Sequence, residues 1–555
     1  MNKKISVKIM ACALAVTALG SMTACGGGGG GIVKDPLTLN VRVRKAGYGT
    51  EYIDALAEQF EKTFEAEGYK VNVLTPREDL VSTVVYRDIY SAKEGSGVDV
   101  YFTSDIDAEK AVTGDFGQVF ADMTDSVWKQ KPIKFDGTEE DLTVEQKMEG
   151  IEFPDGVYND KIYGLPYAYG MGGLIVNKTK LDSYGLDLPR TTDEMFACAE
   201  KILETSLETG TFPFTYSMSG NNYPASVVNA WMAQYGGLDE FNSYWSFENP
   251  DGTKMEGDCY KVFDYDFIEE TLELLYRMYD PAMGAWGVGS QDFTAAQGQL
   301  MKGEAVFYAC GNWFLNEEYE RYNRYVNDVT FIATPMISSL GEKLFGAECG
   351  EKTDQVLSAL VKCADEGKTA EQAEASVETE FSVALDSEDV QTVYERRGYV
   401  KGNINAGLVI SEKSTKKDLA NLFVRFCAST EAGALWAEKA RGISPFALGA
   451  DVNSDVPFLA SVNKIAAYSY HEALVTIETG YRKSMGVVGI FPYMGEIFAT
   501  KIYSTSVTKY DLTTRKPLTD KTNAIYTTAA QALASDMYLD AKNNVETGRW
   551  KVIAK

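Results

Sequence analysis

The most informative part of the chain reads YNDKIYGLPYAYGMGGLIVNK and spans residues 158–178. It continues through a Tyr-Gly-Leu triplet into a Thr-x-x-Glu pattern formed by Thr191 and Glu194. A threonine followed three residues later by a glutamate is typical of a capping box, in which each side chain caps the backbone of the other. The helix that this box opens has an apolar face made of Met195, Ala199, Ile202 and Leu203.

Upstream of this region, apolar strands alternate with amphipathic helices. Strands are expected at Leu37–Val43, Val71–Leu74 and Val98–Phe102. A helical segment is expected around Leu80–Tyr90, and an earlier helix carries a stripe at helical spacing, made of Ile53, Leu56, Ala57, Phe60 and Phe64. Strands separated by crossover helices predict a parallel, doubly wound sheet, and therefore an α/β fold.

Ligands of such sheets bind beyond the carboxyl ends of the strands. The loops at those ends are Lys45–Thr50 and Thr103–Asp105, and neither matches a dinucleotide fingerprint or a P-loop, so phosphate binding is not indicated. Tyr48 and Asp105 are therefore candidate ligand contacts. Asp105 is expected to offer a carboxylate to hydroxyl groups, to cap the helix that the sequence Asp-Ile-Asp-Ala-Glu-Lys predicts, or to do both.

The composition excludes several classes of function. The 555 residues include 53 basic and 80 acidic side chains, and a net charge of −27 argues against nucleic acid as a partner. The single histidine, His471, excludes a zinc site built on two imidazoles, and no GxSxG signature accompanies it. Asp451–Asp455 begins like a calcium loop, but Val456 and Val462 stand where that loop needs glycine and glutamate. No cofactor and no metal are expected.

The first residues have the features of a lipoprotein signal. A basic start is followed by the apolar stretch Ile9–Leu19, which is too short to be a permanent membrane span. Met22–Cys25 resembles the lipobox of bacterial lipoproteins, so residues 1–24 are expected to be removed and Cys25 to carry a diacylglycerol. The glycine run that ends at Gly31 suits a flexible tether. The protein is thus expected at the extracytoplasmic face of the cell membrane; a plain signal peptide with an incidental cysteine is the alternative.

Six cysteines follow the lipobox, and they are sparse, with no CxxC pair. An even number permits disulfides outside the cell, while buried free thiols remain equally plausible from the sequence. The six are Cys198, Cys259, Cys310, Cys349, Cys363 and Cys427.

Residues 158–194 closely resemble the extracellular solute-binding proteins of ABC importers, specifically the sugar-binding family related to maltodextrin-binding protein. The family pattern runs GxIYGLPY, LxYNKxLF and PxTWDE; this chain departs from it with Val176 for Tyr and Thr192 for Trp. Further segments that resemble family elements follow in the family's order. These segments are Phe293–Gly303 with Cys310–Trp313, Phe331–Pro335, Asn403–Phe426, and Thr430–Ala432 with Gly442–Pro445. The insertion at about 343–400 has no counterpart in the family pattern.

This resemblance implies a periplasmic-binding-protein-like fold with two α/β lobes, a multi-strand hinge and a ligand cleft between the lobes. The chain would cross near Pro166–Gly170 and return near Asn405–Ile410. The implied division is a signal peptide at 1–24, a lipidated tether at 25–36, a first lobe at 37–168 plus 405–455, and a second lobe at 169–404 plus 456–555.

Sugar rings stack on aromatic side chains, and their hydroxyls bind carboxylates and amides. Trp313 is the first candidate, because the family places a stacking tryptophan after this strand. For Trp231, the sequence favours a ligand contact and a core position equally. Tyr169 is a candidate because it lies at the implied hinge. The remaining candidates in addition to Tyr48 and Asp105 are Asn312, Tyr223 and Trp286, the last in a glycine-rich loop.

The function implied by the resemblance is capture of a sugar or oligosaccharide by lobe closure and its delivery to an ABC permease. The expected partners are a carbohydrate and the permease subunits, with the membrane reached only through the lipid; a monomer is expected. One alternative is a surface glycoside hydrolase that works with two carboxylates. Another keeps the fold but binds a peptide, a polyamine or a different small solute.

Overall fold

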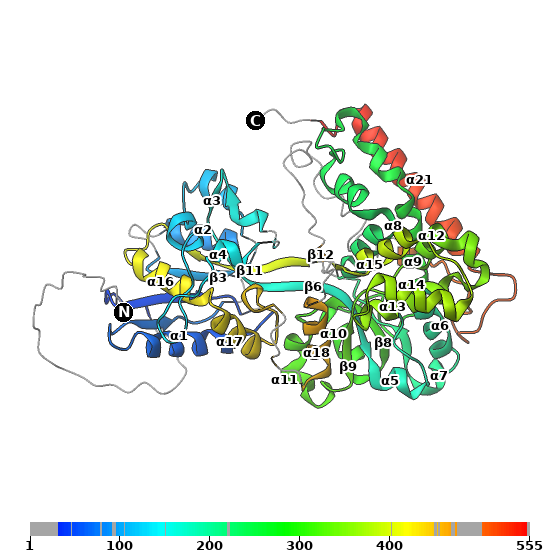
Figure 1. Ribbon diagram of the computed structural model, residues 1–555, viewed down its shortest axis with the longest axis horizontal. Helices are drawn as coiled ribbons and strands as arrows, with labels where there is room; N and C mark the ends of the chain where they lie inside the picture. The colour runs from blue at the N-terminus through cyan, green and yellow to red at the C-terminus, as the bar shows by residue number, and fades with distance from the viewer. Residues whose placement is uncertain are drawn as a thin grey trace, which may run out of the picture.

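The computed structural model describes residues 31–551 apart from 46, 78–79, 92–95, 105, 150, 152, 219–222, 401, 449–451, 453–454, 468–471 and 474–501. The lipobox, Asp105, His471 and most of the calcium-like segment therefore lie outside the described residues. Figure 1 shows two lobes connected by long strands.

The first lobe is built on the parallel strands predicted from the sequence. Strand β1 (Thr38–Val43) lies between β2 (Lys70–Val73) and β3 (Val100–Thr103), and both pairings are parallel. Helices α1 (Glu51–Thr63) and α2 (Ser82–Ser91) make the crossovers. The apolar stripe of α1 faces the sheet, because Ile53 and Phe60 are fully buried. The predicted α/β fold class is confirmed.

One sheet continues through both lobes. Its order is β2-β1-β3-β11-β6-β8-β7, with β9 also paired to β6. Strand β6 (Leu165–Asn177) pairs with β11 (Gly402–Ile410) through its first half. Its second half pairs with β8 (Ala305–Gly311) and β9 (Val329–Ile332), while β7 (Phe212–Phe214) lies outside β8. Strands β6 and β11 thus carry the chain between the lobes (Figure 1).

Helices cover the sheet on both sides. The remaining first-lobe helices are α3 (Ala108–Thr113), α4 (Val144–Lys147), α16 (Lys417–Cys427) and α17 (Thr430–Ala440). Those of the second lobe are α5 (Lys178–Ser183), α6 (Thr192–Leu203), α7 (Ser206–Thr209), α8 (Ala225–Ser246), α9 (Asp266–Met278), α10 (Phe293–Lys302), α11 (Phe314–Tyr322), α12 (Ser338–Cys349), α13 (Thr353–Asp365), α14 (Ala370–Phe381), α15 (Ser387–Arg397), α18 (Pro457–Ala466) and α21 (Ala524–Glu546).

The insertion at 343–400 is mostly helical and belongs to the second lobe. It holds the end of α12, all of α13–α15 and the short strand β10 (Tyr399–Val400). Val356, Leu360 and Val393 are fully buried in the main second-lobe core, so the insertion enlarges that core.

The helix predicted after Thr191 is present, but its capping differs from the prediction. The Thr191 side chain accepts a hydrogen bond from Glu194 N, which makes it the N-cap of α6. The Glu194 carboxylate accepts instead from Arg190 N, at 2.7 Å, and from the Ser358 hydroxyl. The hydrogen bond from the backbone of Thr191 to the Glu194 side chain, which a capping box requires, is thus replaced by a hydrogen bond from Ser358 of α13. Local sequence does not encode this contact.

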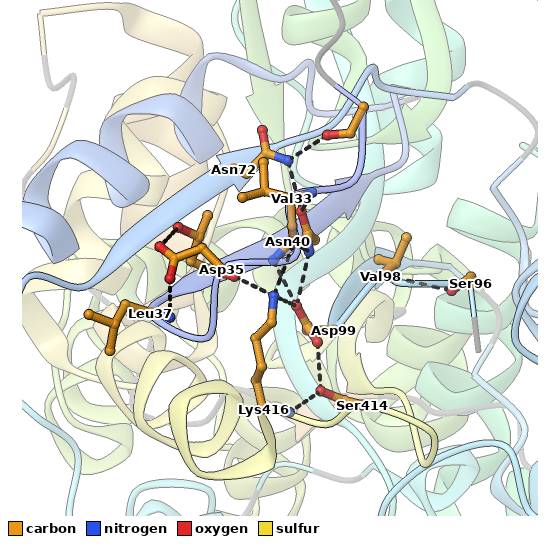
Figure 2. A network of polar contacts seen from close by, with 12 residues as sticks. Val33, Asp35, Leu37, Asn40, Asn72, Ser96, Val98, Asp99, Ser414 and Lys416 are labelled. Atoms are coloured by element: carbon orange, nitrogen blue, oxygen red, sulfur yellow. Dashed lines mark hydrogen bonds and ion pairs between the residues drawn. The ribbon is translucent and has the colours of Figure 1, made fainter. Parts of the chain in front are cut away.

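A buried polar network closes the edge of the first lobe at the amino ends of its strands (Figure 2). Asp99 accepts hydrogen bonds from Asn40 N (2.8 Å) and the Ser414 hydroxyl (2.6 Å) and pairs with Lys416 Nζ at 3.3 Å. Asn40 Oδ1 in turn accepts from Val33 N at 2.9 Å. The network therefore holds the residues that lead into β1 at the edge opposite the carboxyl ends of the strands.

Within the described part of the chain, we find no helix with the length and apolarity that crossing a bilayer requires.

Candidate ligand-binding site

The carboxyl ends of the first-lobe strands point toward the second lobe. Thr103, the last residue of β3, is paired with Gly407 of β11, and Gly407 is paired with Pro166 of β6. Both partner strands lead directly into the second lobe. Arg44, which follows β1, donates its backbone N–H to Phe102 O at 2.9 Å. The crevice that such strand ends predict would therefore lie at the junction of the lobes.

Trp313 lies at this junction and reaches both lobes. It follows β8 and immediately precedes α11. Its side chain is partly buried and packs against the first-lobe core as well as the smaller second-lobe core. Gly311 makes room for the ring, because a Cβ at that position would collide with it. Tyr223 is 6.3 Å from Trp313 between ring centroids, so these two predicted residues lie together.

Tyr48 belongs to an aromatic wall on the first-lobe side. Its ring meets the edge of Trp436 at 5.1 Å, and only 5% of Tyr48 is exposed. Tyr52 and Tyr167 pack against the same tryptophan at 5.9 Å. Tyr48 thus contributes packing to the wall and leaves little ring surface for a ligand in this arrangement.

Asn312 and Tyr169, both predicted as ligand contacts, are parts of the hinge. Asn312 is fully buried; its Oδ1 accepts from Met171 N and its Nδ2 donates to Tyr169 O, both at 3.1 Å. Tyr169 N donates to Ile443 O at 2.8 Å, which ties a third crossing segment to β6. These bonds use the amide of Asn312 to fasten β8 onto β6, so the amide is not directed at a ligand.

Trp231 and Trp286 lie away from the cleft. Trp231 has no exposed surface and donates its indole N–H to Pro335 O at 3.1 Å, so the core reading applies. Trp286 is 61% exposed and meets the edge of Phe212, which is paired with Ala305 at the start of β8. Trp313 follows the opposite end of that strand. Neither Trp231 nor Trp286 is therefore retained as a cleft residue.

The helix cap considered for Asp105 is made by a neighbouring residue. Asp107 is the N-cap of α3 and accepts from Lys110 N at 2.9 Å. Asp105 itself lies outside the described residues, so its role as a ligand contact stays a prediction.

Three contacts between the lobes were not foreseen from the sequence. Asn316 of α11 donates from Nδ2 to Gly47 O at 2.7 Å. Arg441, which caps the carboxyl end of α17, donates to Asn316 Oδ1 at 3.4 Å and lies over the Tyr319 ring at 3.8 Å. Residues 316 and 441 are far apart in the chain, and no local pattern marks them as partners.

Two carboxyl groups follow Trp313 on α11, of which Glu317 is partly buried and Glu318 is buried. Burial raises the pKa of both Glu317 and Glu318 to about 7. Glu317 accepts a hydrogen bond from Gln297 Nε2 at 2.7 Å, whereas Glu318 Oε2 has no partner among the described residues. Helix α11, which begins directly after Trp313, therefore carries two carboxyl groups whose pKa values are raised toward neutral pH.

The six cysteines after the lipobox are free and buried, which decides between the two readings left open by the sequence. Burial raises the pKa of Cys198 and Cys259 to about 11, which keeps these thiols protonated. No cluster of three or more potential metal-ligating side chains occurs among the residues described.

Comparison with known proteins agrees with this architecture. A search of curated proteins found no match. Among solved structures, a probable secreted solute-binding lipoprotein from Streptomyces coelicolor is 14% identical, with a TM-score of 0.51 and coverage of 90% of this chain and 99% of that one. Maltose-bound MalE3 from T. maritima is 15% identical, with a TM-score of 0.51 and coverage of 90% and 99%. The solute-binding protein RafE in complex with raffinose is 14% identical, with a TM-score of 0.51 and coverage of 91% and 99%.

At these identities the likeness to solved structures establishes the fold. The family rests on a separate match, because the profile described as bacterial extracellular solute-binding protein covers residues 55–460. With most of its length matched, this chain belongs to the bacterial extracellular solute-binding protein family.

Proposed function

We propose that the protein captures a carbohydrate between its lobes and delivers it to the permease of an ABC importer. The observation that carries this proposal is the position of Trp313, whose ring packs against the cores of both lobes at the end of the cleft strands. A tryptophan face suits the C–H surface of a sugar ring. The maltose- and raffinose-bound relatives support the choice of a sugar.

Lobe closure is the proposed working motion. The closing units are the first lobe (37–168 plus 405–455) and the second lobe (169–404 plus 456–555). A ligand held by one lobe gains contacts with the other only when the lobes approach, and this difference in affinity shifts the population toward the closed state. The hydrogen bonds of Asn312 at the hinge keep β6 and β8 together during that motion.

We also propose that Cys25 is lipidated and that the protein acts as a monomer at the extracytoplasmic face of the membrane. The sequence before Cys25 supports the anchor, as does the description of the Streptomyces relative as a lipoprotein. The network around Asp99 holds residues 31–40 at the lobe edge remote from the strand carboxyl ends. A tether that starts there leaves the cleft unobstructed.

The protein is proposed to do no covalent chemistry on its ligand. A thermal-shift screen of the mature protein against mono- and oligosaccharides tests the proposal, because a ligand that binds only the folded state raises the melting temperature. Calorimetry on each hit should give one ligand per protein, and chromatography should recover the sugar unchanged. Peptides and polyamines in the same screen test the alternative solutes, and release of shortened sugars would favour a hydrolase.

A further inference from the structure

Arg44 lies at the lobe junction, and its guanidinium makes no ion pair with any residue that the structure describes. It follows β1, and its Nη1 donates to the hydroxyl of Ser104 at the end of β3. Its Nε is buried and has no hydrogen-bond partner among the described residues. Arg44 as a whole is only partly buried.

Other arginines with a buried, unbonded Nε have an acidic neighbour. Arg42, on the same strand, pairs with Asp88 Oδ2 at 3.3 Å. Burial lowers the pKa of Arg515, and the nearby carboxylate of Asp280 opposes this effect. No ion pair of Arg44 occurs among the described residues. Removing a guanidinium from water without a counter-ion is costly, so a position of this kind favours an anion from outside the chain.

The surroundings of Arg44 place it on the ligand side of the first lobe. The positive charge of Arg44 acts on Tyr167, although burial is the larger effect and raises the pKa of that tyrosine to about 12. Tyr167 belongs to β6 and to the aromatic wall of the cleft. Gly47, in the same loop as Arg44, is bonded to Asn316 of α11, the helix that begins directly after Trp313. Arg44 and Trp313 therefore face the same junction from opposite lobes.

We infer that Arg44 makes the cleft selective for carbohydrates that carry an anionic group, with the guanidinium binding a carboxylate or sulfate of the sugar while Trp313 stacks on the ring. This inference rests on the proposed function and narrows its substrate class. A guanidinium suits this role because its planar fork binds both oxygens of an oxyanion at once.

The test compares matched ligands that differ only in charge. Trigalacturonate, its carboxyl-reduced form and a sulfated trigalactose are titrated calorimetrically into the wild-type protein and into the Arg44→Gln, Arg44→Lys and Arg42→Gln variants. Arg42→Gln is the matched control, because it removes a neighbouring guanidinium that is already paired with Asp88.

The wild-type protein is expected to bind at least one anionic probe more than about tenfold tighter than the reduced one. Arg44→Gln should abolish this preference while leaving the affinity for the neutral sugar within about twofold, Arg44→Lys should keep part of it, and Arg42→Gln should retain it. Comparison of the affinities for trigalacturonate and for the sulfated trigalactose shows whether a carboxylate or a sulfate is preferred.

Equal or tighter binding of the neutral sugar by the wild type would overturn the anionic class and leave the proposed function standing. A similar loss of affinity for charged and neutral probes in Arg44→Gln, with a lower melting temperature, would assign Arg44 a structural role and also overturn the inference. If no sugar binds in this test or in the thermal-shift screen, the proposed function itself fails.

Discussion

The guanidinium of Arg441 lies 3.8 Å from the centre of the Tyr319 ring, and this contact joins the end of α17 in the first lobe to α11 in the second. The same arginine donates to Asn316, which itself donates to Gly47 O of the first lobe. These contacts form a latch beside the cleft, and they hold the helix that carries the two glutamates with raised pKa values.

Arg441→Ala is expected to weaken this latch. A partly exposed cation–π contact contributes about 0.5–2 kcal/mol, so ligand affinity should fall about 2–30-fold as the closed arrangement loses stability. Small-angle scattering of the ligand-bound variant should show a larger average radius of gyration than the wild type. Arg425→Ala is the control, since Arg425 bonds Lys131 O and Glu139 within the first lobe. Identical scattering and affinity for Arg441→Ala and wild type would rule out the latch.

Trp313→Ala should weaken sugar binding by about 2 kcal/mol, the typical loss for a buried aromatic anchor. Trp286→Ala is the matched control, because it removes an equally large ring that is 61% exposed and lies at the opposite end of β8. Calorimetry with the tightest ligand from the screen measures both variants. Equal ligand affinities of the Trp313→Ala and Trp286→Ala variants would show that Trp313 does not contact the ligand.

Lys416→Met should destabilise the first lobe by about 3–5 kcal/mol, because it leaves the buried carboxylate of Asp99 without its cation. Chemical denaturation measures the change, and Lys70→Met, which removes an exposed pair with Glu61, should cost less than about 1 kcal/mol. Adding Asp99→Asn to Lys416→Met should recover part of the loss. Independent, additive effects of the two changes would contradict the pairing.

The buried Glu318 should make stability depend on pH. Its folded pKa, about 7, lies above the ordinary value of 4.5, so the folded state holds the proton more tightly than the unfolded state does. The free energy of unfolding should therefore fall as the pH rises from about 4.5 to about 7, and level off above that range.

Glu318→Gln keeps the neutral form at every pH and should lose the share of this dependence that Glu318 contributes, while Glu317 keeps its own. The stability of Glu318→Gln relative to the wild type should thus increase by about 1–3 kcal/mol between pH 5 and pH 8, as measured by urea denaturation. Glu320→Gln, on the exposed side of α11, controls for the loss of one negative charge. A constant difference between Glu318→Gln and wild type across this range would show that Glu318 does not titrate there.

Local patterns in the sequence predicted the elements that depend on neighbouring residues. The strand at Leu37–Val43 is observed as Thr38–Val43, and the stripe from Ile53 lies on the helix Glu51–Thr63. The limits of such elements were less certain: the helical segment expected around Leu80–Tyr90 is observed as Ser82–Ser91, and the strand expected at Val98–Phe102 is observed as Val100–Thr103. Alternation and helical spacing report which face is apolar, but they say little about where hydrogen bonding to the rest of the fold stops a helix.

The site was only partly predictable. Trp313 and Tyr223 were both predicted as ligand contacts and lie together, whereas Asn312, predicted as a ligand contact, and Trp231, predicted evenly as a ligand contact or a core residue, are buried and bonded inside the protein. An aromatic or amide side chain looks the same in a sequence whether it faces a cleft or a core. The raised pKa values of Glu317 and Glu318 were not foreseen either, since they arise from burial under elements distant in the chain.

The sequence by itself determined the α/β class and the family, because these depend on periodicity and on motifs that stand in a set order. Only the tertiary structure decided which side chains meet at the lobe junction. Arg44 bonds Ser104 and has no ion pair within the described part of the chain, and Arg441 reaches Tyr319, because strands and helices far apart in the chain pack in one arrangement. Burial and distance set the charge and the accessibility of each group, and both are properties of the packed chain.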